Sequence, residues 1–149
     1  MLVEQSEKIE PVEAYPKADL LNRFIAKFVD FLVVALLYEM PLKISFVIGL
    51  VYLFIADGFV RGSIGKWLIG LQIMTMENQV QVTFREAIIR NIPLGLAYLA
   101  YTIPFVGWLI AVGIVGFESL LMIGNPNGRR LGDEMAKTFV LDMKGVRTI

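Results

Sequence analysis

Long apolar stretches, separated by short polar ones, dominate the chain from residue 20 onward. Four of these stretches approach the length of a membrane-spanning helix, which needs about 20 mostly apolar residues. They cover residues 20–40, 44–60, 84–103 and 105–123. The pattern therefore predicts an all-α membrane protein with four transmembrane helices.

The boundary between the last two stretches allows a second interpretation. Pro104 separates them, but proline is tolerated inside membrane helices, so one long kinked helix is an alternative. The basic residues favour four spans, because 13 of the 14 then share one side of the membrane with both termini, and only Lys43 lies on the other. Cytoplasmic loops carry such an excess of Lys and Arg. We expect a multi-pass protein of the plasma (inner) membrane with both termini cytoplasmic.

The polar segments predict a small cytoplasmic cap on a transmembrane domain of residues 18–143. Two short β-like runs within residues 71–84 suggest a hairpin. The run 138–143 is expected to pair with it, because a third strand would cover an open hairpin edge. Residues 1–17, which are polar and mostly acidic, are expected to be a flexible cytoplasmic tail, and residues 144–149 a C-terminal tail.

Composition supports the membrane class and narrows the chemistry. Of the 149 residues, 56% are hydrophobic and 19% are charged, whereas soluble domains are about 45–50% apolar. The formal net charge is zero, which provides no basic field for nucleic acid. Cys and His are absent, which removes disulfides, Cys or His metal sites and Cys–His nucleophiles. We expect no enzyme activity, no catalytic residues, no cofactor and no metal site.

Of the acidic residues inside the apolar stretches, three are candidates for a site, namely Asp30, Asp57 and Glu118. A charge near the bilayer centre costs about 2.5–3.5 kcal/mol on insertion scales, so such residues are either functional or paired. As a functional site, carboxylates from different helices would share a proton or Na⁺. As a structural staple, Arg23 would pair with Asp30, which lies on the same helix face, or with Asp57. Glu118 has no basic residue close by on its own helix, which makes it the candidate to bind a proton.

Two further charges have a local structural explanation. Thr83 and Glu86 fit a capping box that begins the third helix. Arg90 lies four residues after Glu86, a spacing at which an ion pair forms on one helix face. We therefore expect Glu86 to be structural.

A third group of residues is predicted to contact lipid. Arg61, Lys66 and Trp67 fall between the second and third apolar stretches, at the expected cytoplasmic interface. Basic and Trp side chains at that depth favour anionic lipid headgroups. The lipid bilayer is accordingly an expected partner.

Three short motifs occur in order along residues 18–142. They are "RFIAKFVD" with Arg23, Ala26 and Asp30, "GSIGKWLIGLQI" with Gly62, Gly65, Lys66, Gly70 and Leu71, and "RRLGDEMAKTFVL" with Asp133, Ala136 and Thr138. Together they resemble the signature of the RDD family of membrane proteins. The resemblance implies that Arg23, Asp30 and Asp133 form a signature polar cluster. Asp133 would fold back toward Arg23 or Lys66 to close it.

The resemblance implies transport of an undefined ligand, with ion/proton exchange as one proposal, or a membrane adaptor role. Two departures from the family pattern matter. Gly132 stands where many members have His just before the closing Asp, so a mechanism that needs this His is in doubt. Many members also have three spans rather than four.

Two functional hypotheses follow. The first is a transporter or cation/proton exchanger that uses the inward carboxylates Asp30, Asp57 and Glu118 and works as a homo-oligomer, because four short helices enclose little volume. The second is a non-catalytic scaffold or regulator of a partner membrane protein. The two differ in the state of the acids: an exchanger should expose them to one water-accessible cavity, and a scaffold should hold them paired and dry.

Overall fold

The computed structural model describes residues 17–41 and 43–146, with side chains up to residue 144. Most of this part is helical, with one small sheet. The predicted tails therefore lie largely outside the described residues. The elements are α1 (Leu20–Tyr38), α2 (Ser45–Ile55), η1 (Ala56–Gly58), α3 (Ile64–Ile69), β1 (Leu71–Thr75), α4 (Phe84–Tyr101), α5 (Gly107–Gly124), α6 (Leu131–Met135), β2 (Thr138–Asp142) and α7 (Met143–Val146).

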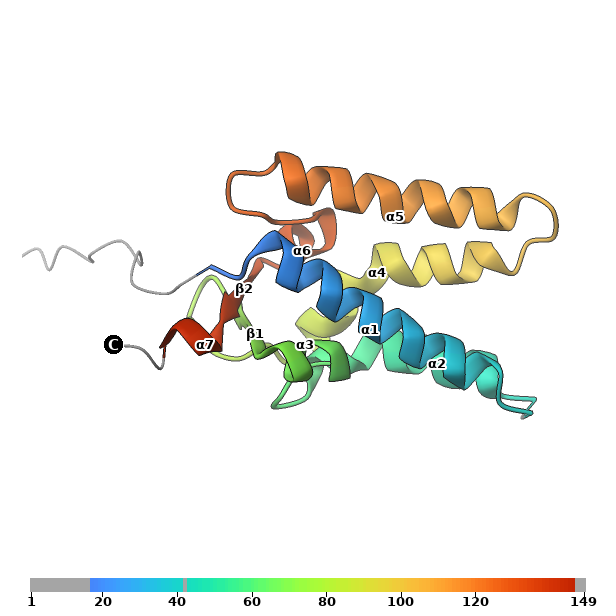
Figure 1. Cartoon of the computed structure of the whole chain (residues 1–149), viewed down its shortest axis with the longest axis horizontal. Helices are drawn as coiled ribbons and strands as arrows, with labels where there is room; N and C mark the ends of the chain where they lie inside the picture. Colours follow the sequence, from blue (N-terminus) through green and yellow to red (C-terminus); the bar gives the residue numbers. More distant parts are fainter. Residues whose placement is uncertain (1–16, 42, 147–149) are drawn as a thin grey trace, which may run out of the picture.

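The four longer helices form two antiparallel hairpins, α1–α2 and α4–α5, that lie side by side (Figure 1). The turns inside the two hairpins lie at one end of the molecule, and the sheet with the short helices α3, α6 and α7 forms a cap at the other. The chain reverses through residues 102–106, so the alternative of one long kinked helix is wrong. The four predicted apolar stretches are confirmed as four separate helices.

Four membrane spans are not confirmed. Within the described residues, α5 is the one helix that is long and apolar enough to cross a membrane, and Ser45–Gly58 is apolar but shorter. The charges of α1 and α4 explain the difference, since Arg23, Lys27 and Asp30 dilute the apolar character of the first helix. Most residues of α5 are not buried, unlike those of a core helix in a soluble protein.

The cap contains a two-stranded antiparallel sheet in which β1 pairs with β2, from Leu71 opposite Asp142 to Thr75 opposite Thr138. This confirms the predicted pairing of the closing strand. The predicted hairpin is reduced to an isolated bridge between Met74 and Gln81. Few residues remain between the turn and the start of α4 at Phe84, so the returning chain has no length for a second ladder.

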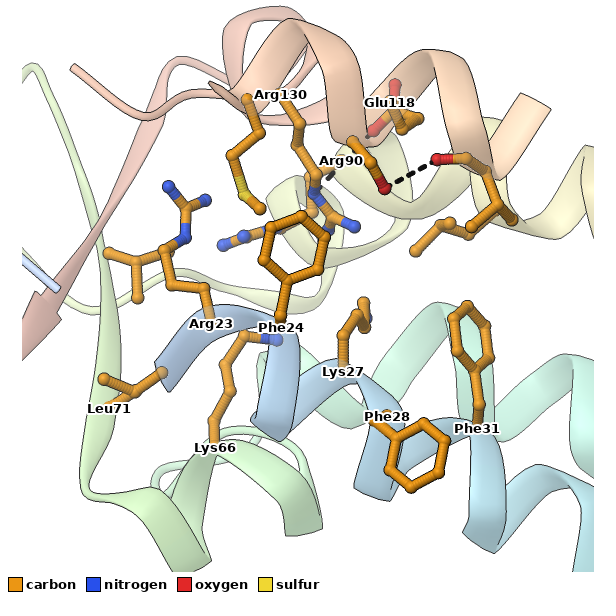
Figure 2. A pocket seen from close by; sticks show the side chains of 15 residues that line it. Arg23, Phe24, Lys27, Phe28, Phe31, Lys66, Leu71, Arg90, Glu118 and Arg130 are labelled. Atoms are coloured by element: carbon orange, nitrogen blue, oxygen red, sulfur yellow. Dashed lines mark hydrogen bonds and ion pairs between the residues drawn. The ribbon is translucent and has the colours of Figure 1, made fainter. Parts of the chain in front are cut away.

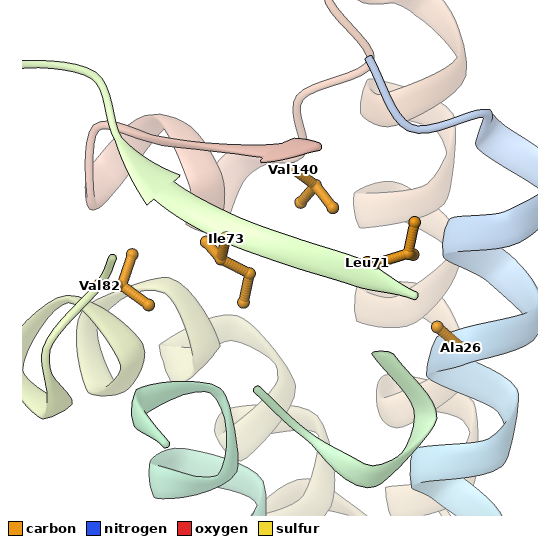
Figure 3. Packing of buried hydrophobic residues seen from close by; sticks show 5 residues of the cluster. All are labelled: Ala26, Leu71, Ile73, Val82 and Val140. Carbon is orange, nitrogen blue, oxygen red and sulfur yellow. The ribbon is translucent and has the colours of Figure 1, made fainter. Parts of the chain in front are cut away.

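A small apolar core joins the cap to α1. It consists of the buried residues Ala26, Leu71, Ile73, Val82 and Val140 (Figure 3). A Cβ atom on Gly65 would lie 1.8 Å from the carbonyl oxygen of Ala26. Gly65 therefore permits α3 to pack directly on α1, next to the charged residues of that helix.

The distribution of polarity is inverted relative to a soluble protein, in which charged residues are rarely fully buried. Asp30, Asp57, Arg90 and Asp133 are each at most 2% exposed. Large apolar side chains cover the outside instead, among them Leu21, Phe28 and Leu36 on α1 and Trp108, Val112, Phe117 and Leu120 on α5. A surface of this kind suits a lipid environment.

Candidate functional site

Asp30 accepts hydrogen bonds from three groups around it. They are the backbone N–H of Gly65 at 2.9 Å, Ser63 Oγ at 2.7 Å and the Tyr52 hydroxyl at 3.1 Å. Lys27 Nζ lies 3.9 Å from the carboxylate, one turn earlier on α1. Asp30 therefore joins α1 to α2 and α3.

Arg23 does not pair with Asp30, and the expectation that the two residues form a staple is wrong. Seven residues separate them, which is about 10 Å along the helix axis. Arg23 instead forms an ion pair with Asp133 of α6 and donates a hydrogen bond to the backbone oxygen of Gly128. The structure thus brings Arg23 and Asp133 together from positions 110 residues apart in sequence.

Asp57, in η1, is surrounded by donors from two other elements. It forms an ion pair with Lys66 of α3, lies 3.5 Å from Arg90 Nε of α4 and accepts a hydrogen bond of 3.1 Å from Asn91. Arg90 therefore does not pair with Glu86, as the i,i+4 spacing suggested. Glu86 completes the predicted capping box with Thr83.

Asp133 is fully buried among three arginines. Arg23 and Arg90 pair with it, Arg90 Nη2 at 2.6 Å, and Arg130 Nε lies 3.3 Å away. Burial opposes ionisation of this carboxyl, but the charges of Arg90, Arg130 and Arg23 together outweigh it and hold its pKa below the usual range of Asp. The carboxylate is therefore ionised at neutral pH.

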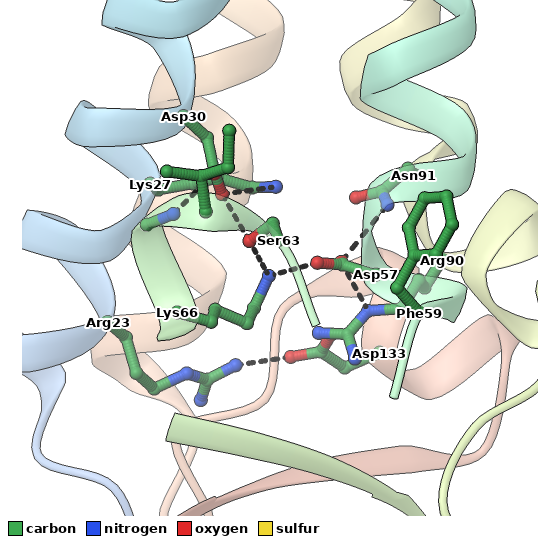
Figure 4. A network of polar contacts seen from close by, with 12 residues as sticks. Arg23, Lys27, Asp30, Asp57, Phe59, Ser63, Lys66, Arg90, Asn91 and Asp133 are labelled. Atoms are coloured by element: carbon green, nitrogen blue, oxygen red, sulfur yellow. Dashed lines mark hydrogen bonds and ion pairs between the residues drawn. The ribbon is translucent and has the colours of Figure 1, made fainter. Parts of the chain in front are cut away.

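These contacts link into one continuous charge network (Figure 4). Ser63 connects the contacts around Asp30 with those around Asp57. It donates a hydrogen bond to Asp30, and its Oγ lies 3.4 Å from the Nζ of Lys66, the partner of Asp57. Arg90 connects Asp57 to Asp133. The signature residues Arg23, Asp30 and Asp133 thus belong to one network, although Asp30 reaches the other two only through intermediates. We use "charge network" for Arg23, Asp30, Asp57, Ser63, Lys66, Arg90 and Asp133.

Glu118 lies beside the charge network but has fewer and longer contacts than the three aspartates. Its nearest cation is Arg130, whose Nε is 3.9 Å from Glu118 Oε2. The sequence places no basic residue beside Glu118 on its own helix, and Arg130 approaches it from the segment after α5 instead. Among the described residues, neither Glu118 oxygen has a hydrogen-bond partner. Arg130 itself donates to Asn91 Oδ1 at 2.9 Å.

A pocket of about 220 Å³ opens between α1 and α5, over the charge network. Figure 2 shows Phe24, Phe28 and Phe31 along α1, with Glu118 and Arg130 across the space. The basic residues in its lining are Arg23, Lys27, Lys66, Arg90 and Arg130, and the acidic one is Glu118. We call this space the α1–α5 pocket.

The residues predicted to contact lipid headgroups separate in the structure. Arg61 and Trp67 are exposed, and the Arg61 guanidinium carbon lies 5.7 Å from the centre of the Trp67 ring. Lys66 is buried and paired with Asp57, so it does not lie at the exposed interface beside Arg61 and Trp67. Burial lowers the pKa of the Lys66 ammonium, against the opposing effect of Asp57.

Sequence reasoning did not assign site roles to Ser63, Tyr52 or Arg130. The double arginine at 129–130, directly before the closing motif, is the one signal that pointed to Arg130. Within the described chain, no group of three or more His, Cys, Asp or Glu side chains is arranged to hold a metal ion.

Comparison with models of known protein families gives a match. The family model of the RDD family matches residues 36–137, which is more than half of the chain and includes Asp57, Lys66 and Asp133. No curated protein and no solved structure matches the chain.

Proposed function

The chain belongs to the RDD family of membrane-associated domains, and from this premise we propose that it is a non-catalytic membrane module that serves as a scaffold or regulator of a partner membrane protein. In this proposal the charge network staples the helices and the cap into one rigid unit. The observation that carries the proposal is the state of Asp30, Asp57 and Asp133. Each is nearly fully buried and is contacted by a cation and by hydrogen-bond donors.

This state argues against an exchanger that uses Asp30 and Asp57. A Na⁺ or proton would have to displace Lys66 from Asp57, or reach Asp30 past Ser63, Gly65 and Tyr52. Removing one partner of a buried ion pair costs about 3–5 kcal/mol, because the other charge is left without compensation. A cycle of binding and release at these residues would meet that cost at every turnover.

The proposal includes a multi-pass arrangement with the cap on the cytoplasmic side. Its support is that, apart from Lys43, the described basic residues lie in the cap or in the cap-proximal halves of the helices. The helix Ser45–Gly58 would be shorter than the hydrocarbon core, which is about 30 Å thick. Local thinning of the bilayer would accommodate it.

Glu118 supports a second candidate function, proton-coupled transport at a single carboxylate. It lines the α1–α5 pocket, and its oxygens have no hydrogen-bond partner among the described residues. An acid in this position would accept a proton without breaking the charge network. This is the part of the exchanger hypothesis that the geometry supports.

Two measurements on the purified protein separate the candidates. A scaffold predicts a stoichiometric partner, either a second copy or another membrane protein, after extraction in mild detergent. It also predicts no Na⁺- or K⁺-dependent dissipation of a pH gradient above that of empty liposomes. Flux in wild-type proteoliposomes that disappears in Glu118→Gln would overturn the scaffold proposal in favour of the second candidate.

A further inference from the structure

We propose that the α1–α5 pocket binds the phosphodiester headgroup of an anionic phospholipid that enters sideways from the bilayer. The proposed ligand carries one net negative charge, as phosphatidylglycerol does. This site is distinct from the exposed surface around Arg61 and Trp67. The inference requires membrane association but not the scaffold role, because a lipid would occupy the pocket in either functional case.

The first support is the charge balance. The pocket and the charge network together bury or half-bury five basic side chains, Arg23, Lys27, Lys66, Arg90 and Arg130. Four acids face them, Asp30, Asp57, Glu118 and Asp133. With all nine groups ionised, one positive charge is left uncompensated in a region of low dielectric, where it is costly. A bound monoanion would neutralise it.

The second support is an unpartnered donor. Arg90 is 1% exposed and lines the pocket, yet its Nη1 has no hydrogen-bond partner among the described residues. A buried donor without a partner costs about 1–3 kcal/mol, and more when the group is charged. Lys27, at the pocket wall, has its carboxylate partner 3.9 Å away, which leaves its ammonium able to donate to a ligand. Both groups would donate to phosphate oxygens, for which Arg and Lys are common ligands.

The third support is the polarity of the lining. Phe28 and Phe31 follow Arg23 and Lys27 along α1, in the direction away from the cap. Val115 and Leu94 contribute further apolar wall from α5 and α4. A lipid with its headgroup at the basic end would thus place its acyl chains toward the bilayer middle, which is the orientation of a lipid in the cap-side leaflet.

Size and access favour a lipid over a soluble solute. A cavity of about 220 Å³ is below the roughly 300–1,000 Å³ typical of sites that enclose a whole small molecule. It would take a headgroup and leave the chains outside. Phe28, on the α1 wall, is 64% exposed, as expected for a residue that contacts acyl chains at the opening.

The test compares two substitutions that each remove one basic side chain, one at the pocket wall and one at the exposed interface. Lys27→Met removes a positive charge from the pocket wall but leaves Asp30 its three hydrogen-bond donors. Arg61→Met removes a positive charge from the exposed interface. Each variant and the wild type are exchanged into detergent micelles that contain equal phosphatidylglycerol and phosphatidylethanolamine, and bound lipid is counted by native mass spectrometry.

We expect wild type to retain one phosphatidylglycerol in preference to phosphatidylethanolamine, whose ammonium would face the basic pocket. Lys27→Met should lower that preference about fivefold, and Arg61→Met should change it less than twofold. Glu118→Gln should raise it, because it removes the one acid that lines the pocket, and this variant keeps the test valid if Lys27→Met fails to fold.

Three results would overturn the inference. The first is equal retention of the two lipids by wild type. The second is equal loss of preference in Lys27→Met and Arg61→Met, which would assign the effect to the exposed interface. The third is stabilisation of the lipid-free protein by inorganic phosphate to the same extent as by phosphatidylglycerol, which would identify a soluble anion as the ligand.

Discussion

The charge network and the α1–α5 pocket share Arg23, Lys66 and Arg90, yet the charges in the two regions are paired to different degrees. In the network, Asp133 contacts three arginines and Asp57 contacts Lys66, Arg90 and Asn91. In the pocket, Glu118 has a single cation at 3.9 Å, and Arg90 Nη1 has no partner among the described residues. Charged groups whose partners are all in place resist titration and displacement. Charged groups that lack partners favour the binding of a ligand or a proton. The comparison therefore divides one polar interior into a structural part and a binding part.

The largest expected loss of stability comes from a substitution of Asp133 in the charge network. Asp133→Asn leaves Arg23, Arg90 and Arg130 facing one another without the central carboxylate, and should lower the free energy of unfolding by about 3–5 kcal/mol. Thermal unfolding in detergent measures the loss. Glu134→Gln, at the exposed neighbouring position paired with Arg129, is the control and should cost at most about 1 kcal/mol. Equal losses in the two variants would contradict a structural role for the network.

Gly132→Ala tests the backbone contact that positions Asp133. A Cβ atom at residue 132 would lie 1.9 Å from the carbonyl oxygen of Arg90, so α6 must move away from α4. We expect a loss of about 1–3 kcal/mol, as for overpacking of a core. Gly116→Ala on α5 meets no atom within 4 Å and should leave stability unchanged or raise it by up to about 1 kcal/mol. Because of the same close contact with Arg90, a His at position 132 would not fit here without a backbone shift.

Acid should weaken the contribution of the charge network to stability in a defined pH window. The pKa of Asp133 is lower in the folded protein than in the unfolded chain, so its stabilising contribution is complete above the unfolded value and is lost as the pH falls toward the folded value. Between pH 4 and pH 3 the unfolded chain takes up the proton and the folded protein does not, which should cost about 1 kcal/mol. Unfolding midpoints measured from pH 7 to pH 3 test this. Stability that stays constant down to pH 3 would contradict the prediction.

Glu118→Gln should have the smallest effect on stability. It removes an ion pair at 3.9 Å and no hydrogen bond from the described residues, and Arg130 keeps Asp133 and Asn91 as partners. We expect a change within about 0.5 kcal/mol in the same unfolding assay. A loss as large as that of Asp133→Asn would place Glu118 in the structural part instead.

Sequence reasoning succeeded where the determining interactions are local or follow a strong pattern. The Thr83–Glu86 capping box depends on residues three apart, and the closing strand has a clear β-like pattern with one open edge to pair with. Helix-face reasoning failed for Arg23 and Arg90, because it considers only neighbours on the same helix. Their partners, Asp133 and Asp57, are brought to them by the packing of α6 and η1, which periodicity does not predict.

The predicted spans show a second limit of the sequence. Apolar stretches located four helices, but the charges that they carry can be assigned to a buried network only when the neighbouring helices are known. Lys66 illustrates this, since a basic residue beside Gly65 and Trp67 looked like an interfacial anchor. The close packing that Gly65 permits between α3 and α1 carries Lys66 inside instead.

A double-mutant cycle on Asp57 and Lys66 tests most directly whether the network stabilises the fold through its ion pairs. Lys66→Met alone leaves Asp57 with less compensation, and Asp57→Asn alone leaves the buried ammonium without its carboxylate, so each should lower the free energy of unfolding by about 3 kcal/mol or more. The double variant should be more stable than the sum of the single losses predicts, by about 1–3 kcal/mol. Losses that add to within about 0.5 kcal/mol would contradict the account, because they would show that the two charges do not stabilise each other.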